Sequence, residues 1–453
     1  MKQMVKTIGE GTFWLSFSSV LLKFVSLASV LFTLSRLDIY EYGLVQLTYS
    51  SLGLFGIFAL PGLGVMVLAD MGVAKSKDDT GEMKEIFSNY FKIQIVLGIV
   101  AWAILFFGSS FIAQYYKGQI GLLLKIISFS FLFSPFRSMY SLLFSINFKF
   151  FYQSMYTLIE ESLKAIFIFS AFFIFKMRAD GVIFAVVLSQ ATVLLFFLPQ
   201  FFKLQAGFIH SQSKNIRKFW HILYRHGKWA VSYNYLHNVA QNVRLFLVHF
   251  FVGTEAVGIF SVAQGLFSNL SSFFPLNQAV APALSQYRSD RKSFFRLVYK
   301  SVKYQVIGFA CIGFISWFAV PPFIMFFFPK YAGSLPLFKI MVFSLIPAGY
   351  ATITTVYYVF KLQKSLLFFE IIRMVSIVVL LPILTFFFGL KGLALETVLT
   401  VCFVVWVRNR MLSKKIPEFN FSLRYILSVD EYDKIIFGRF KGYVMNKLKF
   451  FGI

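Results

Sequence analysis

Residues 88–113 read SNYFKIQIVLGIVAWAILFFGSSFIA, a run of 26 residues in which Lys92 is the only charged side chain. A bilayer core of about 30 Å requires roughly 20 mostly apolar residues in a helix, because each residue rises about 1.5 Å. A helix satisfies its backbone hydrogen bonds internally, which lipid demands. The stretch therefore predicts a transmembrane helix.

Eleven further stretches have the same character. They are 11–34, 43–69, 119–146, 155–176, 181–203, 229–252, 256–284, 300–328, 334–360, 363–388 and 391–411. The whole chain of 453 residues is 58% hydrophobic and 14% charged, with 62 phenylalanines. A soluble chain of this length cannot hide so much apolar surface. We expect an all-α polytopic membrane protein with twelve transmembrane helices.

The Lys and Arg residues in the connections set the orientation. With a cytoplasmic N-terminus, 30 of the 44 basic residues fall in inner segments, 6 in outer loops and 8 within helices. This asymmetry predicts that both termini are cytoplasmic. It also accounts for most of the net charge of +25 without nucleic acid, since inner basic loops attract anionic lipid.

Four regions follow from these spans. We expect an N-terminal six-helix bundle at 1–203, a basic cytoplasmic linker at 204–228, a C-terminal six-helix bundle at 229–411 and a basic cytoplasmic tail at 412–453. The tail carries interleaved aromatic residues, so it either lies on the membrane as an amphipathic helix or is a solvated basic tail.

The two halves repeat one another. Gly43 corresponds to Gly258, Lys125 to Lys339, Pro135 to Pro347 and Gly181 to Gly392, at offsets of 211 to 215 residues. Six helices per half preserve the orientation, so the halves should be related by a pseudo-two-fold axis along the membrane normal. Two such bundles predict a central cavity that opens to alternate sides of the membrane.

Ionisable side chains inside a membrane usually face a cavity or a partner. Eight basic residues fall within the spans: Lys23, Lys92, Lys125, Arg137, Lys164, Arg244, Lys339 and Arg373. Four acids accompany them as candidates for ion pairs or for ion coupling: Glu160, Glu161, Glu370 and Glu396. The long side chains of Lys92, Lys125 and Lys339 can reach the interface from nearby helix ends.

The best candidates for a cavity are Lys23, Arg137 and Arg244, which lie deep and have no carboxylate close in sequence. Lys164 and Arg373 each follow glutamates by three or four residues, so an ion pair and a substrate contact are both open to them. A cationic cavity predicts an anionic substrate, and a phosphate or pyrophosphate group suits guanidinium and ammonium groups best.

Prolines interrupt three spans. Pro135 and Pro347 occupy equivalent positions, and Pro61 lies in the sequence LPGLG. Proline removes a backbone donor and bends a helix, so these are candidate gating kinks or static bends.

Two motifs resemble a known family. Residues 35–47, SRLDIYEYGLVQL, and 250–266, FFVGTEAVGIFSVAQGL, resemble paired signatures of the Wzx-like oligosaccharide (O-antigen or polysaccharide) flippases of the multidrug/oligosaccharidyl-lipid/polysaccharide exporter superfamily. The resemblance implies movement of an undecaprenyl-pyrophosphate-linked oligosaccharide to the outer leaflet of a bacterial cell membrane, driven by an ion gradient. Many relatives carry Asp where this chain has Arg244, so a cation-coupling role does not transfer to that position.

Other functions stay open. A multidrug exporter of the same superfamily would need an unpaired carboxylate, and Glu396 is the one acid without a basic neighbour in sequence. A membrane polysaccharide polymerase or glycosyltransferase would need outer acids, which Asp38 and Glu41 could supply. There is no P-loop, metal motif or cofactor motif, so we expect no enzyme and no cofactor. Expected partners are the polyprenyl-linked glycan, anionic lipids and polysaccharide assembly proteins.

Overall fold

The computed structural model describes residues 2–59, 63–115, 119–209, 228–272, 290–360, 362–416 and 419. These residues form α-helices and short 3-10 helices and contain no strand. Pro61, most of the predicted linker and nearly all of the predicted tail lie outside the described residues.

The N-terminal half runs through nine helical segments in the described residues. They are α1 (Lys2–Arg36), α2 (Ile39–Leu54), η1 (Phe55–Ala59), α3 (Leu63–Ser76), α4 (Thr80–Tyr115), α5 (Gln119–Ser128), α6 (Ser130–Ile146), α7 (Phe150–Phe173) and α8 (Ala179–Ile209).

The C-terminal half follows a similar order where the structure describes it. Its described segments are α10 (Lys228–Val252), α11 (Thr254–Ser272), α13 (Arg291–Phe327), η3 (Pro329–Tyr331), α14 (Ser334–Val342), α15 (Leu345–Ala348), η4 (Gly349–Ala351), α16 (Thr352–Val359), α17 (Gln363–Phe388) and α18 (Leu390–Lys415).

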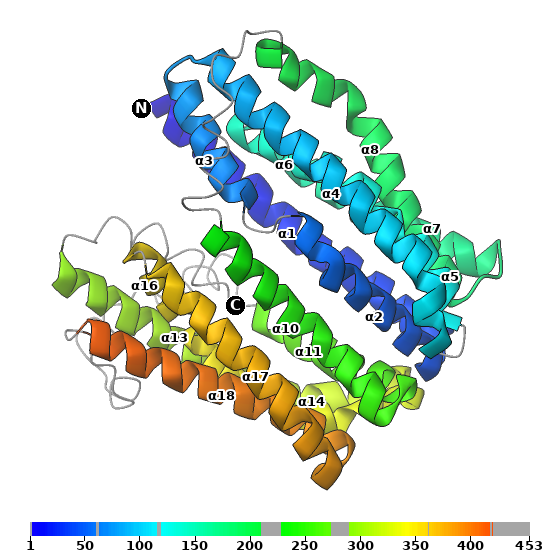
Figure 1. The fold of residues 1–453 in the computed structure, drawn as a ribbon. Coiled ribbons are helices and arrows are strands. Elements are labelled where there is room, and N and C mark those ends of the chain that lie inside the picture. Colours follow the sequence, from blue (N-terminus) through cyan, green and yellow to red (C-terminus); the bar gives the residue numbers. More distant parts are fainter. Residues whose placement is uncertain are drawn as a thin grey trace, which may run out of the picture.

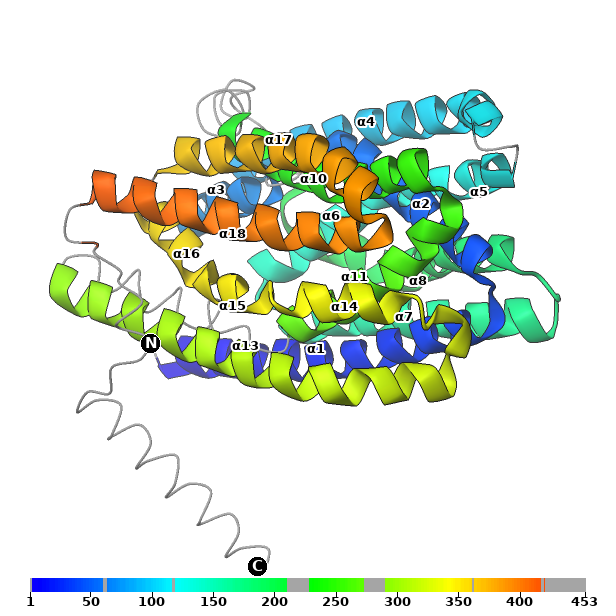
Figure 2. The same cartoon turned by 90° about the horizontal axis from the view of Figure 1, so that it is seen from below.

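The two halves form two lobes (Figure 1), and their long helices run in a common direction (Figure 2). The lobes meet where α2 and α11 pack together, and we call this the joined end. Toward the start of α1 and the end of α18 the ribbons lie farther apart, and we call this the separated end (Figure 1). This two-lobed helical architecture confirms the predicted fold class.

Six described helices are long and apolar enough to cross a membrane, and the bent pair formed by Ser334–Val342 and Leu345–Tyr357 adds a seventh. Many aromatic side chains on them face outward, including Phe107, Phe314 and Phe386. Such a surface is stable only against lipid, so the chain is a multi-pass membrane protein. Where the structure describes them, the predicted spans fall mainly on helical residues, with breaks such as those at Phe129 and at residues 343–344. The count of twelve crossings remains a prediction.

Equivalent helices break at equivalent places. The break between α5 and α6 falls at Phe129, and the break between α14 and α15 falls at residues 343–344. The second break bends the span by 47°. Pro347 explains it, because a proline at this position cannot donate to the carbonyl of Phe343 four residues earlier. Pro135 is buried within α6.

The repeat is also visible in the packing. α1 packs on α7 as α10 packs on α17, and α7 packs on α8 as α17 packs on α18. Separate apolar clusters stabilise each half, around Tyr140 in the first and Tyr357 in the second. A third cluster joins the halves and includes Leu44 and Phe260.

Candidate functional site

A cavity of about 400 Å³ lies between the two halves, near the joined end. α1 and α2 line it from one side, and α10 and α11 line it from the other. α1 and α2 are equivalent to α10 and α11 in the repeat. The cavity therefore lies near the pseudo-two-fold axis that relates the two halves. The predicted inter-lobe position of a cavity agrees with this arrangement.

The lining combines apolar and uncharged polar side chains. Its polar members are Tyr42, Gln46, Tyr49, Ser50, Gln241, Asn242, Ser261, Gln264, Ser268 and Asn269. Amides and hydroxyls both donate and accept hydrogen bonds, which suits a ligand rich in hydroxyl groups. No Lys, Arg, Asp or Glu belongs to the described lining. The described lining therefore includes none of the basic residues that the sequence proposes for the cavity.

Arg244 lies behind the cavity, inside the C-terminal half. Its Nε is 3.0 Å from Oε2 of Glu396, and its Nη2 donates to Oε1 at 3.2 Å. The exposed fractions of the two side chains are 5% and 0%. The Thr400 hydroxyl donates to the same carboxylate at 2.8 Å. Arg244 thus has a carboxylate partner and Glu396 is not isolated, contrary to expectation.

A second charged group in the C-terminal half joins α10 to α17. Arg373 Nη1 is 3.4 Å from Glu370 Oε2, so the ion pair permitted by their spacing forms. His237 Nδ1 lies 3.2 Å from Glu370 Oε1 and 3.1 Å from Arg373 Nη1. His237 was not among the predicted site residues, because nothing near it in sequence distinguishes it from a packing residue.

The N-terminal half carries its own ion pairs on α6 and α7. Arg137 Nη2 is 3.3 Å from Glu160 Oε2, and Lys164 pairs with Glu161. The side chain of Arg137 is 52% exposed, whereas that of Glu160 is nearly buried. The expectation that Arg137 lacks a carboxylate partner is wrong, although its guanidinium keeps an exposed face.

Lys23 is exposed on α1. It precedes Leu27, a residue that lines the cavity, by four positions. Residues four apart share one face of a helix, about one turn from each other. Lys23 therefore lies on the cavity-facing side of α1, one turn toward the separated end.

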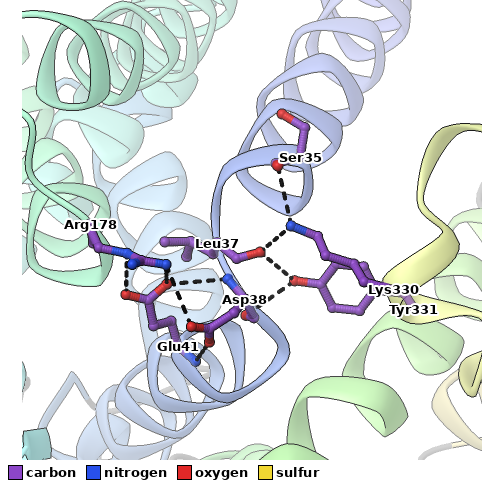
Figure 3. A network of polar contacts seen from close by, with 7 residues as sticks. All are labelled: Ser35, Leu37, Asp38, Glu41, Arg178, Lys330 and Tyr331. Carbon is purple, nitrogen blue, oxygen red and sulfur yellow. Dashed lines mark hydrogen bonds and ion pairs between the residues drawn. The ribbon is translucent and has the colours of Figure 1, made fainter.

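Polar contacts close the joined end (Figure 3). We call them the joining network, formed by Ser35, Leu37, Asp38, Glu41, Arg178, Lys330 and Tyr331. Asp38 and Glu41 form a capping box that begins α2. Arg178 pairs with Glu41, and its Nη2 is 3.5 Å from Asp38 Oδ2. The acids considered for an enzyme site therefore serve a helix cap and an ion pair.

Lys330 and Tyr331 supply the part of the joining network that comes from the C-terminal half. Lys330 Nζ donates to the carbonyls of Ser35, at 3.2 Å, and Leu37. The Tyr331 hydroxyl donates to the carbonyls of Leu37 and Asp38, each at 3.3 Å. A cation at the end of α1 also complements the partial negative charge of that helix terminus. Burial lowers the pKa of Lys330, which the nearby carboxylates oppose.

Within the described residues, no group of three His, Cys, Asp or Glu side chains could hold a metal ion. Cys311 and Cys402 are free and exposed. Pro61 cannot be placed relative to the cavity, since it lies outside the described residues.

Comparison with known proteins supports the two-lobed helical fold. The model of a family described as polysaccharide biosynthesis protein matches residues 8–288. An inward-facing multidrug resistance MATE family transporter of the MOP superfamily has 14% sequence identity and a TM-score of 0.70, over 87% of this chain and 98% of that one. Lipid II flippase MurJ in an inward closed conformation has 17% identity and a TM-score of 0.68, over 91% and 88%.

An outward-facing MATE transporter of the same superfamily has 12% identity and a TM-score of 0.66, over 91% of this chain and 96% of that one. No curated protein is detectably similar to the chain in sequence. At these identities the structural matches establish the fold of MOP superfamily transporters and no more.

Proposed function

The chain belongs to the polysaccharide biosynthesis protein family, and on that premise we propose that it is a flippase. Its substrate is an undecaprenyl-pyrophosphate-linked oligosaccharide, which it moves from the cytoplasmic to the outer leaflet of a bacterial cell membrane. Both termini and the separated end lie on the cytoplasmic side, and the joined end lies outside. No covalent chemistry is part of this function.

The uncharged polar cavity between the two halves carries the proposal. Five amide side chains from three helices converge on it: Gln46, Gln241, Asn242, Gln264 and Asn269. Sugars present many hydroxyls and little charge, so amides can bind them without the desolvation of ions. A cavity for cationic drugs would place a carboxylate in the lining, and the described lining has none.

The pyrophosphate is held by basic groups nearer the separated end. Lys23 is exposed on α1, one turn from the cavity toward the separated end. The half-exposed guanidinium of Arg137 offers two parallel hydrogen bonds to a phosphate. Arg373 and Lys164 lie in partly exposed ion pairs and can supplement this charge. Arg244 is too buried for direct contact and acts as a structural counterion.

Transport follows from alternating access. In this structure the joining network and the α2–α11 contact close the joined end, which we place on the outer side. The oligosaccharide enters between the lobes from the cytoplasm while its lipid chain stays in the membrane. Opening of the joined end then releases the glycan outside. The basic linker at 204–228 and tail at 412–453 attract anionic lipids, and polysaccharide assembly proteins are further partners.

The test uses the purified full-length protein in proteoliposomes with a fluorescent lipid-linked oligosaccharide. Leaflet exchange is measured by the fraction that an external quencher reaches. Replacing both Gln46 and Gln241 with Leu removes hydrogen bonds worth about 1 kcal/mol each, so we expect a fall in rate on the order of tenfold or more. Gln114→Leu, an exposed glutamine outside the cavity, is the matched control.

Two results would overturn the proposal. One is wild-type protein that exchanges no lipid-linked glycan while exporting cationic drugs in the same vesicles, which would identify a drug exporter. The other is a double variant that exchanges the glycan at the wild-type rate.

A further inference from the structure

We propose that His237, Glu370 and Arg373 form a proton-binding site that decides which partner Arg373 holds. This inference rests on the proposed function, because it assigns the place at which protons act on transport. It concerns a group of side chains that contributes nothing to the cavity lining itself.

One ring nitrogen lies between two competing partners. His237 Nδ1 is 3.2 Å from Glu370 Oε1 and 3.1 Å from Arg373 Nη1. A carboxylate accepts hydrogen bonds and a guanidinium donates them. Nδ1 can donate to Glu370 only when it carries a hydrogen, and it can accept from Arg373 only when it does not. The two contacts therefore belong to different states of Nδ1, and a proton that binds the bare nitrogen moves the ring from the Arg373 contact to the Glu370 contact.

The two states differ by one proton on the His237 ring, and no other covalent bond changes. When Nδ1 is bare, Arg373 donates to His237 and to Glu370, whose Oε2 is 3.4 Å from Nη1. When a proton binds Nδ1, the imidazolium donates to Glu370 and repels Arg373. The guanidinium is then released toward an incoming anion. Histidine is the side chain whose charge ordinarily changes between about pH 5 and 8.

The charged surroundings favour an effect on anions. Arg244, Arg373 and Arg408 face Glu370 and Glu396 across α10, α17 and α18. These five groups carry a net charge of +1, which becomes +2 when His237 binds a proton. Proton uptake thus strengthens attraction for a pyrophosphate near the cavity.

Few other titratable groups face His237. Tyr233, on the same helix, stacks on its ring at a centroid distance of 6.2 Å. The segments α2 and η1, which pack against α10, contain no Asp, Glu, Lys, Arg or His from Gly43 to Ala59. α11 carries only Glu255, at the joined end.

His237 is placed to exchange protons with the space between the lobes. Its side chain is 38% exposed. It precedes Gln241, which lines the cavity, by four residues, so it lies on the same face of α10 one turn toward the separated end. Lys23 lies at the corresponding level of α1, because it precedes the cavity-lining residue Leu27 by four residues.

The direct test follows the histidine ring by NMR in lipid nanodiscs with ¹³C,¹⁵N-labelled histidine. The chain has five histidines, and His237→Gln identifies the resonance. We expect the ring signal of His237 to change with pH. Glu370→Gln removes the acceptor of the charged ring and Arg373→Gln removes a competing cation, so the two variants should move the midpoint of that change in opposite directions.

The opposite signs make the test sharp. His249, on the same helix and next to Thr254, is the internal control, and its midpoint should stay constant in both variants. A His237 resonance that does not titrate, or midpoints that stay fixed or move in the same direction, would overturn the site. These two variants keep His237, so the result stands even if His237→Gln folds poorly.

Glycan exchange separates the two proposals. With the lipid-linked oligosaccharide in proteoliposomes, wild-type rates should depend on pH between 5 and 8, His237→Gln should lose that dependence, and His249→Gln should keep it. If the His237→Gln variant keeps the dependence, this inference fails and the flippase stands. If wild type exchanges no glycan at any pH, the flippase proposal itself fails, while the NMR result still reports on proton binding.

Discussion

Gly43 and Gly258 make the same close contact from opposite halves of the molecule. A Cβ built on Gly43 would lie 2.2 Å from the Thr254 carbonyl oxygen, and one built on Gly258 would lie 2.3 Å from the Ile39 carbonyl oxygen. Both pairs are related by the same offset of 215 residues. The equivalent helices α2 and α11 therefore contact each other across the pseudo-two-fold axis. They approach so closely at these two positions that only glycine fits.

Replacing either glycine with alanine should push α2 and α11 apart, because the obstacle in each case is backbone rather than a flexible side chain. Overpacking of this kind costs about 1–3 kcal/mol. We expect Gly43→Ala and Gly258→Ala to lower the thermal unfolding temperature measured in detergent, and to slow glycan exchange. Gly108→Ala, in α4 and outside the described cavity lining, is the control, since a Cβ there meets nothing within 4 Å. Equal stability of all three variants would contradict this explanation.

The buried pair of Arg244 and Glu396 predicts a strong dependence of stability on both partners. Removing one partner of a buried ion pair leaves an unpaired charge, at a cost of about 3–5 kcal/mol. We expect Glu396→Gln to reduce the free energy of unfolding by that order, measured by denaturant titration in micelles. The double variant Arg244→Met, Glu396→Leu should recover much of the loss.

A double-variant cycle supplies the check on that pair. If the effects of Arg244→Met and Glu396→Leu simply add, the two side chains do not interact and the ion pair has no structural role. Arg178→Ala with Glu41→Ala is a more exposed pair for comparison, with a smaller expected coupling, because exposed pairs contribute about 0–1 kcal/mol.

The joining network should hold the outer side closed. Lys330→Ala removes the hydrogen bonds to the carbonyls of Ser35 and Leu37. With Gln46→Cys as a reporter in the cavity, and Cys311 and Cys402 replaced by Ser, we expect severalfold faster modification by a membrane-impermeant thiol reagent added outside. Lys391→Ala, another lysine predicted to lie outside and exposed here, should leave the rate unchanged. Unchanged labelling in Lys330→Ala would exclude a closing role.

Lys23 should set the affinity for the pyrophosphate. Lys23→Gln removes a cation one turn from the cavity, and loss of one charge-assisted hydrogen bond should raise the half-saturating substrate concentration about tenfold. Lys23→Arg should retain most of the affinity. Lys92→Gln is the control, because Lys92 is also exposed within an apolar helix but does not adjoin the described cavity. An equal effect of both Gln variants would remove the specific role of Lys23.

The linear pattern of residues was enough to predict the membrane class and the repeat, and it showed which local ion pairs could form. Long apolar runs such as 88–113 can bury their side chains only in lipid, and the offset between Gly43 and Gly258 reflects one packing rule used twice. The pairing of Arg373 with Glu370 also depends only on spacing along one helix. In each case the physical cause acts over a few residues or over composition.

Contacts between distant segments were decided by the tertiary structure alone. Arg244 and Glu396 are 152 residues apart, and His237 and Glu370 are 133 apart. Their contacts depend on how α10 rotates against α17 and α18, which the packing of whole helix faces sets. For the same reason Arg244 points away from the cavity, while its near neighbours Gln241 and Asn242 face into it. The position of a residue along an apolar run predicts its depth in the membrane. A helix turns about 100° per residue, so the side that a residue faces is fixed only when the helices pack.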